Sequence, residues 1–538
     1  MIAALLPRLH HAGLGWRIIL ALLIYVRCSS PRTASSRAEV LLAHVLFPIS
    51  NFLYALAAGG LALFGFNALV LTWRYYATRA LIVAPPAPEV WPSVTVQLPI
   101  FNERAVVERV IDAAAALQYA PGRLSIQVLD DSTDDTSSLA RARVALHCAR
   151  GVDIVHHHRA QRPGHKAAAL AEGLQLTGAE FVAVFDADFV PAQDFLQRVI
   201  PHFADAQVAA VQTRWAHLNA EQSLLTRAQA LALDGHFVVE QAARSRSALF
   251  FNFNGSGGVW RASAIVDSGG WQADTIAEDL DLSYRAQLRG WQLRYLPQVE
   301  CGAEVPYSLA GFKRQQFRWA KGSVQCLRKH WRAVAADSGS LWRKLQAGLH
   351  LAGYLAHPLL LLLLLASLPL ALAGGYSGIA LGVLGVAGFG PPVICAVAQW
   401  ALHPDPLRRL AIFPALLLLQ VGMQANNARG VLEGLLGRNP RMFLRTPKSG
   451  AVGRKFSGGT HYALPLDWTT WAEILLGAYA LFAAAVAAQR APGMLPFLLL
   501  LALGNLYTAA LGLAEAWRQH WAASPPRSAR WAGFGTQS

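Results

Sequence analysis

The sequence is poor in charged residues and in cysteine. Only 15% of its 538 residues are charged, against about a quarter in typical soluble domains. The five cysteines show neither a CxxC pair nor the spacing of a disulfide framework. These two shortages argue against an ordinary soluble protein and against a small disulfide-stapled one. We expect most of the cysteines to be small buried hydrophobic side chains.

Acidic residues are also scarce relative to basic ones, with 32 Asp and Glu against 47 Lys and Arg and a formal net charge of +15. The sequence carries no RNA-binding signature and no basic run with interleaved aromatic residues, so nucleic acid is not the expected partner. Many basic residues lie close to apolar segments instead. A membrane surface and an anionic substrate therefore explain the charge better.

Hydrophobic residues make up 54% of the chain, and their excess lies before residue 75 and after residue 345. The N-terminal membrane region, residues 1–84, contains a predicted span at 46–73. A shorter apolar segment at 14–26, interrupted by Arg17, is a short span, a signal-like segment or an interfacial helix. A Pro-rich linker at 85–92 then leads into a segment of globular composition.

The C-terminal membrane region covers residues 341–517 and is followed by a short basic tail, 518–538. Polar residues crowd the second half of 409–437, which favours a helix in the membrane interface. The positive-inside rule places the 85–340 domain, the basic loop 438–455 and the tail in the cytoplasm of a multi-pass membrane protein. The expected spans in this region are 357–373, 378–400, 471–488 and 494–513.

Between the two membrane regions, strand-like and helical runs alternate. This alternation predicts an α/β domain with a mainly parallel sheet and crossover helices. The strands are expected at 93–98, 124–129, 152–155, 181–185 and 208–212. The helices are expected at 103–117, 134–149, 165–176 and 192–203.

Polar side chains follow three of these strands: Asn102 and Glu103, Asp130 and Asp131, and Asp186 and Asp188. Ligands of parallel sheets bind beyond the carboxyl ends of the strands, where these residues converge. One such cluster is explained by a turn alone, but convergence from three strands is much harder to explain that way. Carboxylates at a strand end suit Mg²⁺ or Mn²⁺, and the cation suits the diphosphate of a nucleotide sugar.

Three further patterns stand out downstream. Asn254–Gly258 is a turn in which Gly255 and Ser256 let the backbone approach a ligand, although a plain loop explains it equally well. Glu278, Asp279 and Asp281 open a helix that runs to residue 288, where acids are also favoured by the helix dipole alone. His156–His158 cannot all face one ion because strand side chains alternate, so we expect a surface position for them.

These motifs stand in a fixed order: QLPIFNE, VLDDSTD, RPGHKA, DAD, FNGS, ED and QQFRW. The series resembles the membrane-embedded processive glycosyltransferases of family 2, which include cellulose and chitin synthases. Within them it looks most like the plant cellulose-synthase-like A and C proteins, which make β-1,4-linked mannan, glucomannan and glucan backbones. The resemblance is strong over residues 90–330 and looser in the membrane regions.

The resemblance implies a Rossmann-like GT-A catalytic domain and an inverting hexosyltransferase. Asp186 and Asp188 would hold the metal, and Asp279, with Glu278 as second choice, would be the general base. Trp319 would face the terminal sugar of the acceptor, or else anchor the helix at the membrane interface, and Gly255 and Ser256 would lie beside the acceptor. Lys166 and Arg318 would lie near the phosphates of the nucleotide sugar. Gln315 would lie on one short helix with Arg318 and Trp319. The other residues expected to bind the nucleotide sugar are Asn102, Glu103, Asp130 or Asp131, and Gln315.

The run Phe443–Lys448 resembles the gating loop of cellulose synthase, with Arg445 where that family has Val. Thr446 and Lys448 would then contact bound nucleotide; a plain basic cytoplasmic loop is the alternative. The paired spans would let the growing polysaccharide leave through the membrane. The enzyme would lie in the plasma (inner) membrane if bacterial and in the Golgi membrane if it came from a plant.

Two other functions fit part of the pattern. A non-processive transferase acting on a polyprenyl-phosphate lipid would share the sheet and DxD pair but not usually Q-x-x-R-W, and a transporter with a nucleotide-binding domain would need more ionisable residues in its spans. The sequence does not choose between GDP-mannose and UDP-glucose as donor, although the cellulose-synthase-like A resemblance favours mannose. Oligomeric state and accessory subunits are not readable from it.

Overall fold

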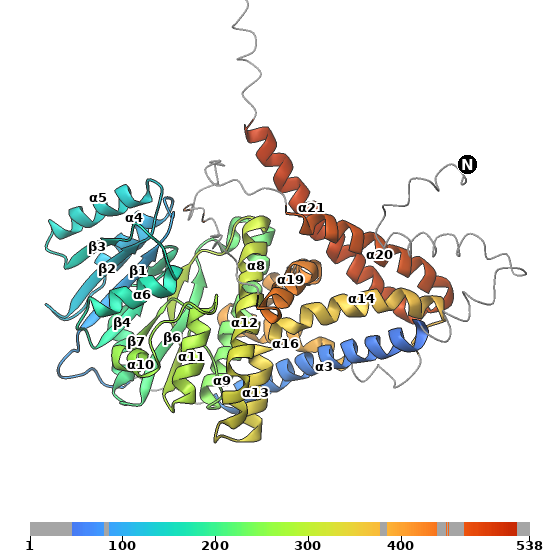
Figure 1. Cartoon of the computed structure of the whole chain (residues 1–538), viewed down its shortest axis with the longest axis horizontal. Coiled ribbons are helices and arrows are strands. Elements are labelled where there is room, and N and C mark those ends of the chain that lie inside the picture. Colours follow the sequence, from blue (N-terminus) through green and yellow to red (C-terminus); the bar gives the residue numbers. More distant parts are fainter. Residues whose placement is uncertain are drawn as a thin grey trace, which may run out of the picture.

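The computed structural model describes residues 46–79, 85–376, 385–437, 448, 450 and 467–523. A sheet domain lies at one end of the molecule and a group of long apolar helices at the other, with α8 and α12 between them (Figure 1). The segment 14–26, Cys28 and nearly all of the loop 438–455, Thr446 included, fall outside the described residues.

The domain is built on an eight-stranded sheet of order β3-β2-β1-β4-β7-β6-β8-β5. β1, β2, β3 and β4 run parallel to one another, β6 is parallel to β8, and β7 and β5 are antiparallel to their neighbours. The predicted mainly parallel α/β fold is therefore confirmed, with two antiparallel strands added. The strands are β1 Val94–Ile100, β2 Leu124–Asp130, β3 Ile154–His158, β4 Phe181–Val184, β5 Phe189–Pro191, β6 Val208–His217, β7 Gly258–Arg261 and β8 Gln292–Ala303.

Apolar layers cover both faces of the sheet, as expected for strands that read as continuous hydrophobic runs. One layer packs beneath α4, α5 and α7, and the other beneath α6, η5, α10 and α11. The bounds are α4 Val107–Ala115, α5 Thr136–Cys148, α6 His165–Gln175, α7 Phe195–Val199, α8 Leu224–Asp234, η5 Gly235–Gln241, α9 Ala242–Arg246, α10 Ala262–Asp267 and α11 Glu278–Leu288. Short 3₁₀ turns, η3 Ile200–Phe203 and η4 Ala220–Gln222, complete this part.

The helix that carries Gln315, Arg318 and Trp319 is α12, Leu309–Ala336, with 28 residues. The prediction of a short helix is wrong, because no proline interrupts this stretch and good helix formers continue to the Asp337–Gly339 turn. Ser308 caps its N-terminus by accepting a hydrogen bond from the Gly311 N–H at 3.1 Å. α12 packs against α11, α13 (Leu341–Leu351) and α19 (Gln424–Leu435), so it joins the sheet domain to the membrane helices.

Four helices in the described part of the chain are long and apolar enough to cross a membrane. They are α3 Phe47–Ala77, the run Gly353–Leu372 (η6 Gly353–Leu355 and α14 Ala356–Leu372), α20 Thr469–Arg490, and the run Pro492–His520 (η9 Pro492–Met494 and the greater part of α21, Leu495–Ala523). The predicted span 378–400 lies partly outside the described residues. Its described part is a shorter apolar helical run, η7 Val386–Phe389 and α16 Gly390–Leu402.

Residues 406–435 form a bent helical pair, with a 45° bend between Gly422 and Gln424. The pair consists of α17 Pro406–Leu410 and α18 Phe413–Gly422 on one side of the bend and α19 on the other. The polar residues Gln424, Asn426 and Asn427 are buried. The Asn426 amide donates to the Lys313 carbonyl at 2.9 Å. The polar half of this segment therefore packs against α12.

The cysteines behave largely as expected. Cys301, Cys326 and Cys395 are buried free thiols, whereas Cys148 is exposed at the end of α5.

Candidate active site

The carboxyl ends of the strands border a cavity of about 250 Å³, which we call the first cavity. Residues that follow β1, β2 and β4 meet here, as the sequence predicted for a parallel sheet. α6, α11 and α12 supply the remaining walls. The predicted site residues that line it are Glu103, Asp131, Lys166, Asp186, Asp188, Gly255, Glu278, Asp279, Gln315, Arg318, Trp319 and Lys448.

A second cavity of about 430 Å³ lies next to the first. Asn254, Asp279, Gln315 and Trp319 line both cavities, so the two meet at these residues. The described residues that line the second cavity include no Lys and no Arg. Its surface is formed mainly by aromatic, amide and imidazole side chains.

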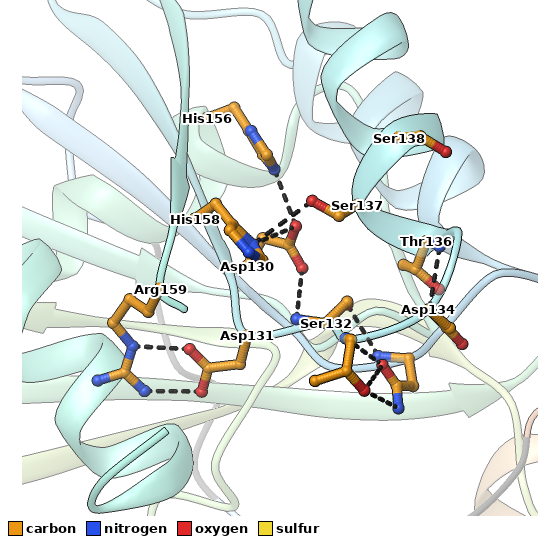
Figure 2. A network of polar contacts seen from close by, with 12 residues as sticks. Asp130, Asp131, Ser132, Asp134, Thr136, Ser137, Ser138, His156, His158 and Arg159 are labelled. Atoms are coloured by element: carbon orange, nitrogen blue, oxygen red, sulfur yellow. Dashed lines mark hydrogen bonds and ion pairs between the residues drawn. The ribbon is translucent and has the colours of Figure 1, made fainter. Parts of the chain in front are cut away.

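The structure separates Asp130 from Asp131, which the sequence could not do. Neighbouring residues at a strand end point to opposite sides, and Figure 2 shows their carboxylates pointing apart. The Asp131 carboxylate lines the first cavity and is held by the Arg159 guanidinium through two hydrogen bonds of 2.6 and 2.7 Å, with Arg162 Nε at 3.3 Å. Arg162 also lies over the Phe101 ring, 3.5 Å from its centroid.

Asp130 is fully buried and is not among the residues that line either cavity. His156 Nε2 and His158 Nδ1 lie 3.0 and 3.2 Å from its Oδ2, and the Ser132 N–H donates to Oδ1 at 2.8 Å. Burial alone would raise the pKa of Asp130, but the hydrogen bonds from His156 and Ser132 outweigh it and hold the pKa well below its usual range. Asp130 therefore fixes the loop that presents Asp131. The predicted surface position is wrong for His156, whose side chain is only 9% exposed.

Lys166 lies at the centre of the first cavity's acidic wall. Its Nζ is 2.6 Å from Asp186 Oδ1 and 3.7 Å from Glu278 Oε1, and it donates to the Gly255 carbonyl at 2.9 Å. Burial lowers the pKa of Lys166, but the Asp186 and Glu278 carboxylates more than compensate and keep it above its ordinary value. The lysine is therefore charged at physiological pH.

Lys448 makes the matching contact on the other acid of the pair. Its Nζ lies 2.6 Å from Asp188 Oδ2 and donates to the Glu304 carbonyl at 3.1 Å. A residue 260 positions away in sequence from Asp188 thus reaches the same cavity. Each aspartate of the pair is therefore ion-paired with an ammonium group.

Asp279 stands where the two cavities meet, in the first turn of α11. Burial and the neighbouring Glu278 carboxylate raise the pKa of Asp279 to about 7, against an opposing effect of Lys166. A carboxylate poised near neutral pH suits a general base. Gly255 has φ +80°, and a Cβ there would lie 2.8 Å from Asp279 Oδ2, so glycine is needed for this close approach.

Two predicted contact residues take supporting positions instead. Ser256 is fully buried, and its hydroxyl accepts a hydrogen bond from the Asp186 N–H at 2.9 Å. The Asn102 amide oxygen accepts from the Thr133 N–H at 2.8 Å, and its backbone N–H donates to the Ser132 hydroxyl at 2.9 Å. Neither lines the first or the second cavity in the described structure, so Ser256 holds the Asp186 strand end and Asn102 ties two loops together.

Glu304 is a site residue that the sequence analysis missed. It lies directly after β8, is buried, and lines the first cavity with Arg109 Nη1 at 2.7 Å from its carboxylate. The signal was the same as for the other acids, a carboxylate after a strand. Glu304 was not predicted as a site residue because the strand before it, β8, was not predicted.

Comparison with known proteins agrees with this geometry. Residues 92–322 match the model of the family described as Glycosyltransferase like family 2. These residues form a glycosyltransferase domain of family 2. The match ends within α12, just beyond Trp319, so it includes every predicted site residue except Thr446 and Lys448.

Several relatives of the family 2 domain are plant proteins. The chain is 42% identical over 264 residues to glucomannan 4-beta-mannosyltransferase 1 of Oryza sativa subsp. japonica, which is 47% of this chain and 50% of that protein. It is 44% identical over 247 residues to glucomannan 4-beta-mannosyltransferase 2 of Arabidopsis thaliana, covering 44% of this chain and 46% of that protein. The chain thus spans about half the length of the curated relatives it matches.

A solved structure confirms the fold of the family 2 domain. The mannosyltransferase PcManGT from Pyrobaculum calidifontis, in complex with GDP-Man and Mn²⁺, aligns over 72% of this chain and 100% of that chain. The TM-score is 0.50 at 24% sequence identity. The likeness supports the GT-A architecture that the family resemblance implied, and the strand order agrees with it.

Proposed function

We propose that this protein is a membrane-embedded inverting mannosyltransferase that extends a β-1,4-linked mannan or glucomannan from GDP-mannose. The observation that carries the proposal is the position of Asp279, a carboxylate with a raised pKa between a cavity lined by both carboxylates and Lys and Arg side chains and one whose described lining has no Lys or Arg. The plant relatives, named glucomannan 4-beta-mannosyltransferases, favour mannose over glucose as the transferred sugar. The names of these relatives give no support to a polyprenyl-phosphate acceptor.

The first cavity suits a nucleoside diphosphate sugar. Phe101 with the Arg162 guanidinium over its ring offers a flat surface for a nucleobase, and Asp131 beside it accepts hydrogen bonds from base or ribose. Arg318 and Lys166 supply positive charge for the diphosphate at the other end of the cavity. Burial lowers the pKa of Arg318, but a guanidinium stays protonated in proteins.

A divalent cation fits the same cavity. Asp186 and Asp188 offer hard oxygen ligands, and each already binds an ammonium group at 2.6 Å. Mg²⁺ is commonly held by one or two carboxylates together with substrate phosphates, so the lack of a third protein ligand among the described residues does not disfavour it. Asp186 and Asp188 would hold Mg²⁺ or Mn²⁺, which would neutralise charge on the departing diphosphate.

The chain's own residues then account for the transfer. The acceptor 4-hydroxyl oxygen bonds to the anomeric carbon as the bond from that carbon to the diphosphate oxygen breaks. Asp279 removes the hydroxyl proton on the acceptor side, and Arg318 and Lys166 stabilise the nucleoside diphosphate on the donor side. Attack from the face opposite to the leaving group inverts the anomeric configuration, which turns an α-linked donor into a β-linked product.

We further propose that the product is processively extended and leaves through the membrane. Trp319 and the second cavity would hold the sugars already added, and four helices long enough to cross a membrane adjoin this domain. The cytoplasmic side of the membrane would carry the catalytic domain. Lys448 would leave Asp188 when substrate and metal bind, and Thr446, outside the described residues, would belong to the same loop.

Radiolabel incorporation tests the proposal. Membranes that contain the full chain are supplied in parallel with GDP-mannose and UDP-glucose, and the product is digested with linkage-specific glycanases. The expected result is a β-1,4-mannanase-sensitive product from GDP-mannose. If polymer is made from UDP-glucose alone, the donor is UDP-glucose and not GDP-mannose. If neither donor supports sugar transfer, the proposal is wrong.

A further inference from the structure

One wall of the second cavity is a helix of unusual geometry. α8, η5 and α9 form a continuous helical run, and its central part, η5, is a π-helix of seven residues. Such stretches are rare and frequently lie at functional sites. From this run, Leu233, His236, Phe237 and Glu240 line the second cavity.

His236 and Glu240 form a polar pair on this wall, to which α8 also contributes Gln229. His236 Nδ1 lies 3.0 Å from Glu240 Oε2, and His236 Nε2 lies 3.4 Å from Asn254 Oδ1. The Asn252 amide donates to the same Asn254 oxygen at 2.9 Å. Burial would raise the pKa of Glu240, but the hydrogen bond and charge of His236 outweigh it, so Glu240 is ionised.

The pair lies close to the reacting centre without belonging to it. Asn254 directly precedes Gly255, at which an added Cβ would be 2.8 Å from Asp279 Oδ2. Asn254 and Asp279 line both cavities, whereas His236 and Glu240 line only the second. A molecule in the second cavity therefore meets the pair just beyond the point where Asp279 acts.

We propose that His236 and Glu240 bind the hydroxyls of the acceptor sugar that precedes the reacting one. This inference rests on the proposed function. An ionised carboxylate accepts hydrogen bonds from two hydroxyls of one sugar, and the imidazole adds a donor or an acceptor. Trp319 and Tyr354, which also line the second cavity, offer flat apolar faces for the sugar rings. The pair thereby recognises the acceptor and aligns its terminal 4-hydroxyl with Asp279.

Acceptor-length kinetics test this role. The full chain and the variants Glu240→Gln and His236→Gln are assayed for mannose transfer from GDP-mannose to methyl mannoside and to mannotetraose. A lost hydrogen bond to a charged group corresponds to about a 10-fold weakening. We expect the KM for mannotetraose to rise about 10-fold or more, while the KM for GDP-mannose and the rate with methyl mannoside stay within about 2-fold of those of the unmodified chain.

Asp194→Asn is the matched control, because it breaks another i,i+4 helix pair, with Arg198, on the exposed side of α7. This control should leave both KM values unchanged. If both cavity variants keep the unmodified KM for mannotetraose, or change the KM for donor and acceptor equally, the inference is wrong. If the unmodified chain transfers no mannose, the proposed function itself fails, which is a different outcome.

Discussion

The two cavities that meet at Asp279 differ in charge. The first gathers most of the carboxylates together with the cations Lys166, Arg318, Arg162 and Lys448, whereas the described lining of the second contains no Lys or Arg and offers mainly Trp, Tyr, His and amide side chains. Phosphates need cations, while neutral sugar rings need flat apolar faces and hydrogen-bonding groups. Under the proposed function, the charged leaving group would lie in the first cavity and the uncharged polymer in the second.

Metal removal should have the largest effect and should act only on the first cavity. We expect EDTA to reduce sugar transfer to background, and Mg²⁺ or Mn²⁺ to restore it, because under the proposed function Asp186 and Asp188 would supply hard oxygen ligands beside the diphosphate. Binding of manno-oligosaccharide should not change under chelation. An equal rate of sugar transfer with and without EDTA would show that the reaction does not need a metal ion.

Asp279→Asn tests the junction between the cavities. Loss of a general base should lower the rate of transfer by about 10²–10⁴-fold while GDP binding is kept. Asp274→Asn is the control, because Asp274 is an exposed carboxylate paired with Lys329 outside both cavities. A near-normal rate for Asp279→Asn would indicate that Glu278, and not Asp279, is the general base.

Trp319→Ala tests the aromatic character of the second cavity. We expect the KM for manno-oligosaccharides to rise by about 10-fold, because the apolar face for a sugar ring is lost, and Trp319→Phe to restore most of the affinity. Trp331→Ala on the same helix is the matched control, since Trp331 is 54% exposed. Equal effects of the two alanine variants would indicate that Trp319 only anchors α12.

The pH dependence should give the smallest effect close to neutral pH. Because the pKa of Asp279 is raised to about 7, kcat/KM should fall about 10-fold per pH unit below that value and level off above it. Glu278→Gln removes one cause of the raised pKa and should shift the profile to lower pH. A pH profile that is unchanged in Glu278→Gln would show that Glu278 does not raise the pKa of Asp279.

Stability should depend on pH in the opposite direction to activity. The folded state holds the Asp279 proton more tightly than the unfolded state does, so the free energy of unfolding should decrease as pH rises from about 4 to about 7.

Much of the fold could be predicted because β4 (FVAV) and the start of β6 (VAAV) are uninterrupted apolar runs, and short runs of this kind between turn residues favour buried strands. β8 could not be predicted, since Pro297 and the two charged residues Arg294 and Glu300 break its pattern, and Glu304 was missed with it. Asp130 and Asp131 show the limit for the site. Alternation places adjacent side chains on opposite sides, but only the packed structure shows that His156 and His158 lie on one side and the first cavity on the other.

The most direct test of the separation between the cavities is initial-rate kinetics with both substrates varied. Two variants suffice: Arg162→Ala, from the first cavity only, and Tyr354→Leu, from the second only. We predict that Arg162→Ala raises the KM for GDP-mannose alone and that Tyr354→Leu raises the KM for mannotetraose alone, each by about 10-fold. A result in which both variants raise the same KM would contradict the assignment of donor and acceptor to separate cavities.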